Sequence, residues 1–156
     1  MGLAIGQKAP DFEVVSSSGK RLRLRDFAGK KNVVLYFYPG DFTPVCTKET
    51  CGFRDLHADL EGQDTEVIGV SVDTDESHER FAEEYGVPFS LVSDRQRELA
   101  KAYGATTVLG DLLGKASRKT FLIDKMGEIR GIFSGELSAS KHVDGVRAAL
   151  DDLSRA

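Results

Sequence analysis

The stretch VVLYFYPGDFTPVC, residues 33–46, decides the fold. Val33–Tyr38 is β-branched and aromatic without alternation, which predicts a strand that is covered on both faces. Pro39 and the glycine after it end that strand, and Thr43 before Pro44 is typical of a helix start, a capping hydroxyl followed by proline at the first helical position. The sequence therefore predicts a central buried strand, a short loop and a helix in direct succession.

The helix after this loop is predicted to run from Pro44 to about Glu61, because apolar residues recur at near-helical spacing up to Gly62. Further along the chain, strand patterns alternate with helical ones, which is typical of an α/β protein. The predicted elements are a strand at 66–72, a helix at 77–85, a strand at 89–92, a helix at 95–103, strands at 120–123 and 128–133, and an amphipathic helix at 138–153. The last two strands flank a turn and are expected to form an antiparallel hairpin at a sheet edge.

The N-terminal part is predicted to form another β-hairpin, since segments 12–15 and 21–24 bracket the polar turn SSSGK. A mixed central sheet flanked by helices, with a helix directly after the central strand, is the thioredoxin-like arrangement, here with the N-terminal hairpin as an extension. The sequence contains no internal repeat, low-complexity tract or linker. Residues 1–156 are therefore expected to form a single thioredoxin-like domain.

Composition and charge exclude several classes of function. The chain has 156 residues, of which 40% are hydrophobic and 29% charged, as in ordinary globular proteins. Its net charge of -4, with Lys and Arg scattered among acidic residues, argues against nucleic acid and anionic membranes as partners. No apolar run reaches signal-peptide or membrane-spanning length, so a cytoplasmic location without a membrane partner is expected.

The chain has two cysteines, Cys46 and Cys51. Without an export signal, they indicate reduced thiols with a chemical purpose rather than a disulfide framework, although two small buried hydrophobic residues remain the alternative. If Thr43 is the N-cap, Cys46 is the third helical residue, where unpaired backbone N–H groups and the helix dipole stabilise an anion. This position favours the thiolate, which is the attacking form of a cysteine.

Cys51 follows Cys46 by five positions, which on an ideal helix separates the Cα atoms by about 8.7 Å and about 140° of rotation. A disulfide needs a Cα separation below about 7 Å. If the two cysteines form a bond, the first turns of the helix must therefore unwind. Gly52 has two interpretations: a weak helix former that helps the unwinding, or a site of close packing between the helix and its neighbours.

These residues resemble a known family. Pro39, Thr43 and Cys46 match the Pro-x-x-x-Thr-x-x-Cys signature of peroxiredoxins, and the spacing in TPVCTKETCGFRD is similar to that of the bacterioferritin-comigratory-protein (Q-type) subgroup. Further matches lie along most of the chain: KAPDF, GVSVD, ESH, FSLVSD, RKTFLID and His142 in the last helix.

The resemblance implies a thiol-dependent peroxidase that reduces hydrogen peroxide and organic hydroperoxides. Cys46 would be the peroxidatic cysteine, oxidised to sulfenic acid, and Cys51 would resolve it as an intramolecular disulfide, as in atypical 2-Cys peroxiredoxins. Thioredoxin or a similar dithiol would then reduce the disulfide. The subgroup further implies a monomer, with a dimer as the alternative.

The same resemblance implies roles for four other residues. Thr43 would hydrogen-bond the peroxide, Pro39 would shield the pocket, and Arg118 would hold the thiolate and the peroxide oxygens, because a guanidinium can serve two oxygens at once. Glu49 would support the loop and the arginine. The alternatives are a surface strand charge for Arg118 and a solvated helix-face residue for Glu49.

Other residues are assigned less specific positions. No metal or other cofactor is expected, since the three histidines have no metal-ligand spacing with the cysteines. His78 is interpreted as a helix-cap or surface residue rather than a catalytic base. Phe37 and Phe42 are candidates for the pocket lining, with core packing as the alternative for Phe37. Segment 104–115 lacks the Met and aromatic residues that the resemblance leads us to expect near Arg118.

Two other functions compete with the peroxidase. A thioredoxin-type thiol-disulfide oxidoreductase would share the fold, but its Cys-x-x-Cys spacing is absent from this sequence. A redox sensor or chaperone-like binding protein, in which oxidation of Cys46 exposes a partner surface, is the second alternative.

Overall fold

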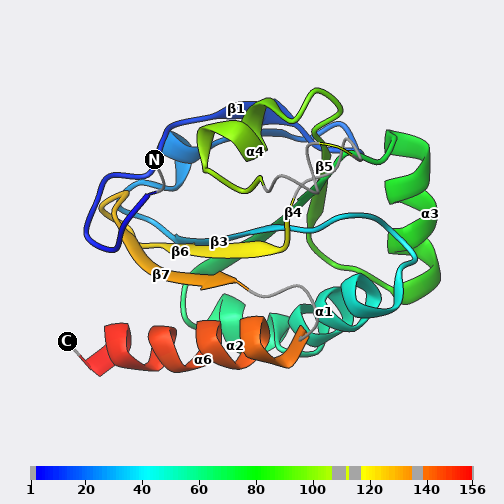
Figure 1. The fold of residues 1–156 in the computed structure, drawn as a ribbon. Helices are drawn as coiled ribbons and strands as arrows, with labels where there is room; N and C mark the ends of the chain where they lie inside the picture. The colour runs from blue at the N-terminus through cyan, green and yellow to red at the C-terminus, as the bar shows by residue number, and fades with distance from the viewer. Residues whose placement is uncertain (1–2, 107–111, 113–116, 135–138, 156) are drawn as a thin grey trace.

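The computed structural model describes residues 3–106, 112, 117–134 and 139–155 (Figure 1). Its central sheet has five strands in the order β5-β4-β3-β6-β7. Strand β3 pairs in parallel with β4 and antiparallel with β6, so the sheet is mixed, as predicted. The bounds of the strands are β3 Asn32–Phe37, β4 Thr65–Ser71, β5 Ser90–Ser93, β6 Lys119–Ile123 and β7 Ile129–Ser134.

Strand β3 lies at the centre of the sheet, and all six of its residues are buried. Alternate side chains point to opposite faces of a strand, so β3 serves two cores. Val33, Leu35 and Phe37 belong to one core cluster, while Val34 and Tyr36 belong to the other. The absence of hydrophobic alternation in its sequence is thereby explained, and its prediction as the core strand is confirmed.

Helices cover both faces of the sheet (Figure 1). One face is covered by α1 (Pro44–Asp55), α2 (His57–Gly62) and α6 (Ala139–Arg155). The other is covered by the predicted N-terminal hairpin, β1 (Glu13–Val15) with β2 (Arg21–Arg23), and by η1 (Leu24–Phe27) and α4 (Glu98–Ala102). Helix α3 (Asp75–Tyr85) packs beside β5 and contributes Phe81 to the core on the α1 side. The thioredoxin-like fold is confirmed.

Two helices differ from their predictions. The helix expected from Pro44 to Glu61 is interrupted at Leu56, which ends α1 and precedes α2. The helix expected from 95 to 103 forms only from Glu98 to Ala102. Arg97 is the N-cap and has a positive φ of 57°, which is not helical, and the carboxylate of Asp94 accepts the backbone N–H groups of Leu99 and Ala100 in the first turn. Such capping by a side chain fixes where a helix begins.

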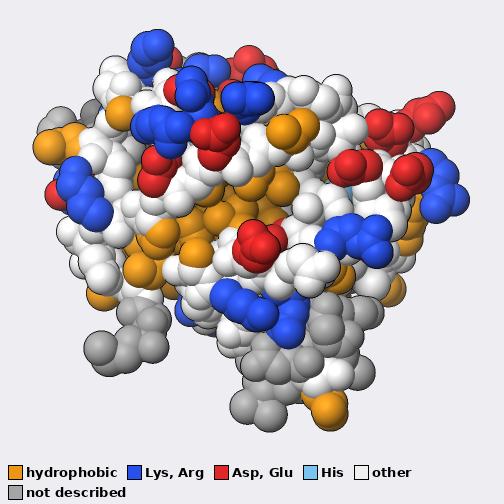
Figure 2. Space-filling model, turned by 90° about the horizontal axis from the view of Figure 1, so that it is seen from above, with side chains coloured by type: hydrophobic (Ala, Val, Ile, Leu, Met, Phe, Trp, Pro, Cys, Tyr) orange, Lys and Arg blue, Asp and Glu red, His pale blue; other side chains and the backbone are white. Residues whose placement is uncertain are grey.

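Figure 2 shows the face that carries β1 and α4: apolar side chains gather in a hollow near its centre, and acidic and basic side chains are interspersed around it. A surface with both signs of charge does not present the continuous basic patch that binds nucleic acid. Among the described residues, no helix is long and apolar enough to cross a membrane. Most of segment 104–115, for which we predicted a departure from the resemblance, lies outside the described residues.

Candidate active site

Cys46 is fully buried in the first turn of α1. Thr43 is the N-cap, with extended backbone angles of -78° and 149°, and Pro44 is the first helical residue, as the sequence predicts. The predicted capping hydroxyl is wrong, however: Thr43 Oγ1 does not cap the helix and instead donates to the carbonyl oxygen of Gly40 at 2.9 Å. The first-turn N–H groups near Cys46 are therefore not used by this side chain.

Arg118 lies beside Cys46 because β6, which follows Arg118, pairs with β3, which leads to Cys46. Its neighbour Lys119 starts β6 and pairs with Phe37, the last residue of β3, after which the chain leads into α1. From there, Nη2 of Arg118 donates to Sγ of Cys46 at 2.8 Å, and the Arg118 side chain is only 3% exposed. The alternative of a surface strand charge is therefore wrong.

The guanidinium of Arg118 also bonds to a second group on α1. Its Nη1 donates to Oε1 of Glu49 at 2.8 Å, and Glu49 lies three residues after Cys46 on the same helix. Burial lowers the pKa of Arg118, but the charges of Cys46 and Glu49 and their hydrogen bonds outweigh it, so the net pKa is raised. The guanidinium is fixed in its charged form between the two groups.

Glu49 is fully buried, so the alternative of a solvated helix-face residue is wrong. Its Oε2 lies 3.4 Å from Oγ1 of Thr120 on β6 and 3.4 Å from Nδ1 of His142 on α6. Thr120 Oγ1 and His142 Nδ1 are themselves 2.8 Å apart. Sequence reasoning missed Thr120, although the period of two in a strand places residues 118 and 120 on the same face.

Tyr36 and Gly52 fix α1 against its neighbours. The Tyr36 hydroxyl lies 2.9 Å from Oγ1 of Thr50, and its ring packs on Phe53 at 5.0 Å between centroids. A Cβ at Gly52 would lie 2.8 Å from Cγ2 of Val143 on α6, which is closer than real contacts allow. Close packing is thus the interpretation of Gly52 that the structure supports.

The remaining predicted residues occupy different surroundings. Pro39 is half-buried on the loop between β3 and α1, and Cys51 is half-buried on α1. Both cysteines are free thiols. Phe37 belongs to the core cluster on the opposite face of the sheet from Cys46, so its assignment to the pocket lining is wrong. Phe42 packs on Phe81 of α3 at 5.1 Å between ring centroids.

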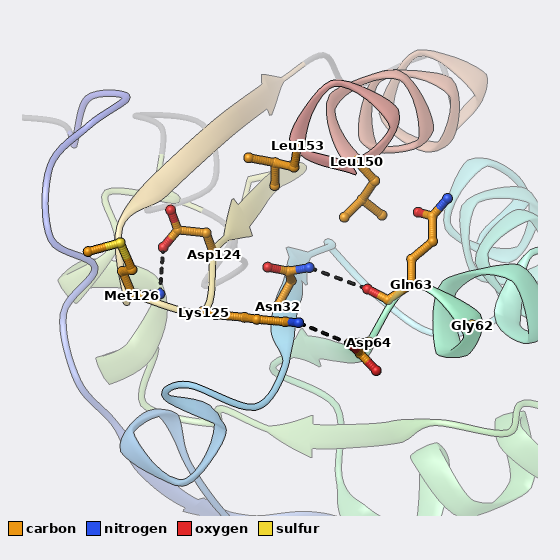
Figure 3. Close-up of a pocket in the computed structure, with 9 residues that line it drawn as sticks. All are labelled: Asn32, Gly62, Gln63, Asp64, Asp124, Lys125, Met126, Leu150 and Leu153. Atoms are coloured by element: carbon orange, nitrogen blue, oxygen red, sulfur yellow. Dashed lines mark hydrogen bonds and ion pairs between the residues drawn. The ribbon is translucent and has the colours of Figure 1, made fainter. Parts of the chain in front are cut away.

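A cavity of about 440 Å³ lies elsewhere (Figure 3). It includes Asn32, the first residue of β3, and Lys125 in the turn after β6. Because α1 follows the other end of β3, this cavity and Cys46 lie at opposite ends of the strand. The cavity is lined by Asn32, Gly62, Gln63, Asp64, Asp124, Lys125, Met126, Leu150 and Leu153, none of which is a predicted site residue.

Comparison with known proteins identifies the family. Residues 5–132 match the model of the AhpC/TSA family. The chain belongs to the AhpC/TSA family. Peroxiredoxin Bcp of Bacillus subtilis is 40% identical over 157 residues, which cover 99% of each chain. The peroxiredoxin described here therefore belongs to the Bcp (Q-type) subgroup, as the sequence predicts.

Solved structures agree with this assignment. Peroxidoxin BcpB from Mycobacterium tuberculosis matches with a TM-score of 0.88 at 33% identity, over 97% of this chain and 98% of that one. The bacterioferritin comigratory protein of Xanthomonas campestris, studied for its alkyl peroxide reduction activity, matches with a TM-score of 0.85 at 29% identity, over 96% and 99% of the two chains. This peroxiredoxin is a thiol peroxidase, and neither competing function is favoured by these relatives.

Proposed function

We propose that this peroxiredoxin reduces hydroperoxides through Cys46, that Cys51 resolves the oxidised cysteine, and that thioredoxin or a similar dithiol regenerates both thiols. In the first step the Cys46 thiolate attacks the terminal peroxide oxygen. The S–O bond forms, the O–O bond breaks, and the departing alkoxide or hydroxide takes up a proton. Cys51 then attacks the sulfenic acid, a disulfide forms and water leaves. A dithiol exchanges with that disulfide and becomes oxidised itself.

The 2.8 Å hydrogen bond from Arg118 to Sγ of Cys46 is the observation that carries this proposal. A buried guanidinium beside the sulfur stabilises the thiolate, and its planar set of donors suits the charge that develops on the peroxide oxygens. Glu49 holds the other side of the guanidinium and so fixes its orientation. In this proposal Arg118 and Cys46 are catalytic, and Glu49 is a positioning residue.

Thr43 is proposed to bind the peroxide as a hydrogen-bond acceptor. Its proton is directed to the carbonyl oxygen of Gly40, so the lone pairs of Oγ1 are available to the O–H of a hydroperoxide. Pro39, on the same loop, is proposed to shield the reacting sulfur from water. Loss of either side chain would slow the attack on peroxide without removing the nucleophile.

Disulfide formation requires a change in α1. Cys46 and Cys51 both lie within α1, where regular helix geometry keeps their Cα atoms about 8.7 Å apart. The backbone bond from Thr47 N to Thr43 O, 2.9 Å long, is one of those that must open in the first turn. The close contact between Gly52 and Val143 lies just beyond Cys51, so α1 can remain packed on α6 there while its first turns unwind.

Single-turnover oxidation by hydrogen peroxide, followed by mass analysis of the cysteines, tests the proposal. We expect rapid loss of two hydrogens in the wild type, a trapped sulfenate at Cys46 in Cys51→Ser, and no fast oxidation in Cys46→Ser. Full turnover of Cys51→Ser with thioredoxin would disprove the resolving role. Oxidation of the wild type no faster than that of a free thiol would disprove the role of Cys46.

The proposed reaction requires no metal or other cofactor. The monomeric state, the cytoplasmic location and the single domain over residues 1–156 stay predictions. Size measurement of the reduced and oxidised protein in solution tests the first of them.

A further inference from the structure

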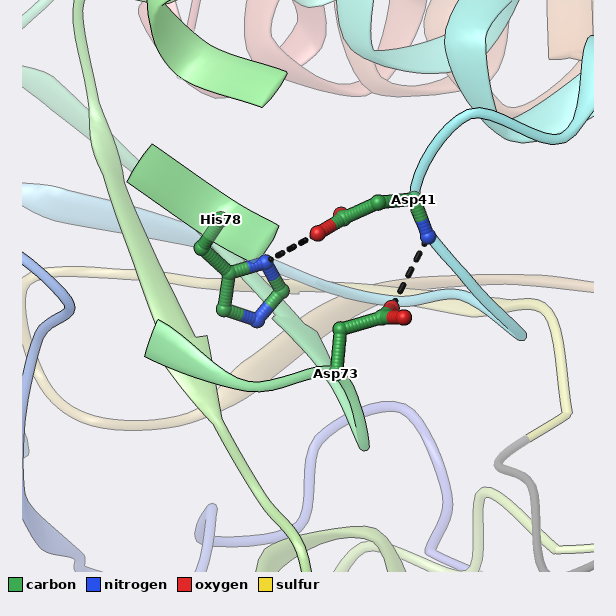
Figure 4. A group of neighbouring side chains, drawn as sticks. All are labelled: Asp41, Asp73 and His78. Carbon is green, nitrogen blue, oxygen red and sulfur yellow. Dashed lines mark hydrogen bonds and ion pairs between the residues drawn. The ribbon is translucent and has the colours of Figure 1, made fainter. Parts of the chain in front are cut away.

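A second group of titratable side chains, buried or half-buried, includes one residue of the loop that carries Pro39 and Thr43. It consists of Asp41 from that loop, Asp73 after β4 and His78 on α3, with one ligand atom of each within 4.8 Å of the others (Figure 4). His78 is fully buried, so its interpretation as a helix-cap or surface residue is wrong. The proposed peroxidase mechanism uses none of these three side chains.

The contacts of His78 define where its protons are. Nε2 lies 3.1 Å from the carbonyl oxygen of Val92, which can only accept, and 3.5 Å from Oγ of Ser71. The proton of that hydroxyl is directed to Oδ2 of Asp73 at 2.5 Å. Neither neighbour donates to Nε2, and Nε2 must therefore carry a hydrogen.

The other ring nitrogen also faces an acceptor. Nδ1 of His78 lies 2.8 Å from Oδ2 of Asp41, and the Asp41 side chain is 1% exposed. That carboxylate accepts two further hydrogen bonds, from Tyr38 OH at 2.7 Å and from Ser77 Oγ at 2.8 Å. Burial and nearby negative charge raise the pKa of Tyr38, which keeps its proton for this bond. Three donors converge on this one carboxylate, an arrangement that favours a carboxylate at Asp41 and an imidazolium at His78 over the neutral pair.

The cluster holds the loop by its backbone as well. The N–H of Asp41 donates to Oδ2 of Asp73 at 2.8 Å. The next residue, Phe42, has a positive φ of 65°, which is uncommon and unfavourable for a bulky residue. Its ring contacts Phe81 and Tyr85 of α3 at 5.1 and 6.3 Å between centroids. The loop is thus fixed to α3 at two successive residues.

The same three side chains have the composition of a cation site. The facing atoms of His78 and Asp41, however, already hydrogen-bond to each other, and the Asp41 carboxylate also accepts from Tyr38 and Ser77. The carboxylate of Asp73 accepts from Ser71 and from the backbone N–H of Asp41. A cation would have to displace the proton between His78 and Asp41. The geometry therefore favours an ion pair over a metal site.

We propose that the buried His78–Asp41 ion pair anchors the loop of residues 39–43 to α3 and thereby positions Thr43 and Cys46 for attack on the peroxide. His78 is then a positioning residue for the first step of catalysis. This inference rests on the proposed function, because it assigns His78 a role in the reaction of Cys46.

The anchor affects the two chemical steps differently. Peroxide attack requires the loop and the first turn of α1 to be in place, and a misplacement of about 1 Å can cost roughly 100-fold in rate. Disulfide formation requires the first turn of α1 to unwind, so it gains nothing from an anchored loop. Loss of the ion pair is therefore expected to slow the first step and to leave the second step as fast as before or faster.

The test combines kinetics with a spectroscopic measurement. In His78→Gln, single-turnover oxidation of Cys46 by hydrogen peroxide should slow roughly tenfold or more, while the rate of disulfide formation from the sulfenate should not fall. The matched control is His57→Gln: His57 forms an (i,i+4) pair with Glu61 at 3.0 Å on α2, away from the loop, and this variant should keep the wild-type rates.

A double-mutant cycle removes the contribution of general destabilisation. In an Asp41→Asn background, the further change His78→Gln should cost much less than it does alone, because the charge pair is already lost. In the unaltered protein at pH 7, nitrogen NMR should detect a hydrogen on both ring nitrogens of His78. This measurement does not depend on whether any variant folds.

Five outcomes separate the inference from the proposed function. Three results would each disprove the anchoring role of the His78–Asp41 pair. They are a neutral His78 ring with one N–H, additive effects of the two substitutions, and an equal slowing of both chemical steps. Slow oxidation of wild-type Cys46 would instead overturn the proposed function. Rapid wild-type oxidation with an unaffected His78→Gln variant would overturn the anchor alone.

Discussion

Nη2 of Arg118 donates to Sγ of Cys46 across 2.8 Å in a site that is closed to solvent. Replacing Arg118 by Lys keeps a positive charge but removes the planar group that serves the sulfur and Glu49 together. We expect oxidation of Cys46 by hydrogen peroxide to slow by roughly 100-fold or more, as when other donors to a developing charge are removed. Stopped-flow oxidation measures this rate.

The control for this substitution is Arg130→Lys on β7. Arg130 donates to Asp124 at 2.7 Å and is 44% exposed. Arg130→Lys is the same chemical change outside the site. We expect the rate of Cys46 oxidation in this variant to stay at the wild-type value. Equal rates in Arg118→Lys and the wild type would remove Arg118 from the proposed mechanism.

Glu49 on α1 is joined to two other parts of the fold through the buried side chains of Arg118, which directly precedes β6, and His142 on α6. Glu49→Ala leaves the Arg118 guanidinium buried without its carboxylate partner, and such a loss costs about 3–5 kcal/mol. Urea unfolding of the reduced protein measures the free energy of unfolding. The same substitution at Glu83, an exposed residue of α3, should change it by less than about 0.5 kcal/mol.

Gly52 packs against Val143, and this contact predicts whether a substitution at Gly52 stabilises or destabilises the protein. Alanine favours helix over glycine by about 1 kcal/mol, but its Cβ would lie 2.8 Å from Cγ2 of Val143. Overpacking of this kind costs about 1–3 kcal/mol, so Gly52→Ala is expected to destabilise the protein. Thermal unfolding measures the effect, and the additional change Val143→Ala should relieve it.

Gly62 provides the comparison for this prediction. It lies in α2, and a Cβ there would have nothing within 4 Å. Gly62→Ala should therefore be neutral or stabilising. A stabilising Gly52→Ala would instead support flexibility, the other interpretation of Gly52.

Ionisation of Asp124 is expected to make the stability of the protein depend on pH. Burial works to raise its pKa, but hydrogen bonds from Arg130 and from the backbone N–H groups of Glu128 and Met126 outweigh it, and the net pKa is lowered. A carboxyl group whose pKa is lowered by folding stabilises the protein above its unfolded pKa of about 3.9. This contribution is lost as the pH falls through the folded value.

Asp124→Asn should therefore lower the free energy of unfolding at pH 7 by about 1.5–3 kcal/mol, the size expected for hydrogen bonds to a charged group. The difference from the wild type should shrink as the pH falls below about 4. Urea unfolding at pH 7 and at pH 3 measures both values. The exposed Asp144 on α6 serves as the control, and a difference that grows in acid would contradict the prediction.

The unwinding of α1 is tested by amide hydrogen exchange. In the disulfide form, residues from Thr43 to about Arg54 should exchange faster than in the reduced form, because the helical bonds of the first turns are open. The amides of β3, buried at the centre of the sheet, are the internal control and should exchange at the same slow rate in both forms. Equal exchange of α1 in both forms would contradict the unwinding step.

Much of the fold could be predicted because local patterns and burial agree. The apolar run Val33–Tyr38 supplies all of the central strand, Asn32–Phe37, except its first residue, and Pro44 starts α1. The interruption at Leu56 could not be predicted, since the apolar spacing continues through it. At the late start of α4, the Asp94 side chain accepts from the first-turn N–H groups. An aspartate is equally typical of a turn, so the sequence alone did not reveal this contact.

The site was only partly predictable, for a related reason. The family signature selected Cys46, and the wider resemblance implied Arg118 and Glu49; the structure brings the three together by hydrogen bonds. Thr120 and the buried position of His78 could not be deduced, because each depends on which residues face it across the fold. A period of two or 3.6 gives the face of an element but not its partner.

Leu56, where α1 ends and α2 begins, limits how far an opening can spread along the chain. Leu60 of α2 is buried in the core, and α2 contacts β4, so the second helix has its own attachment to the sheet. A cycle of opening and closing that starts near Cys46 need not disturb the contacts beyond Leu56. If Cys46 and Cys51 form the proposed disulfide in each turnover, the part of this face that α2 covers would stay covered, which would limit the apolar surface exposed to aggregation.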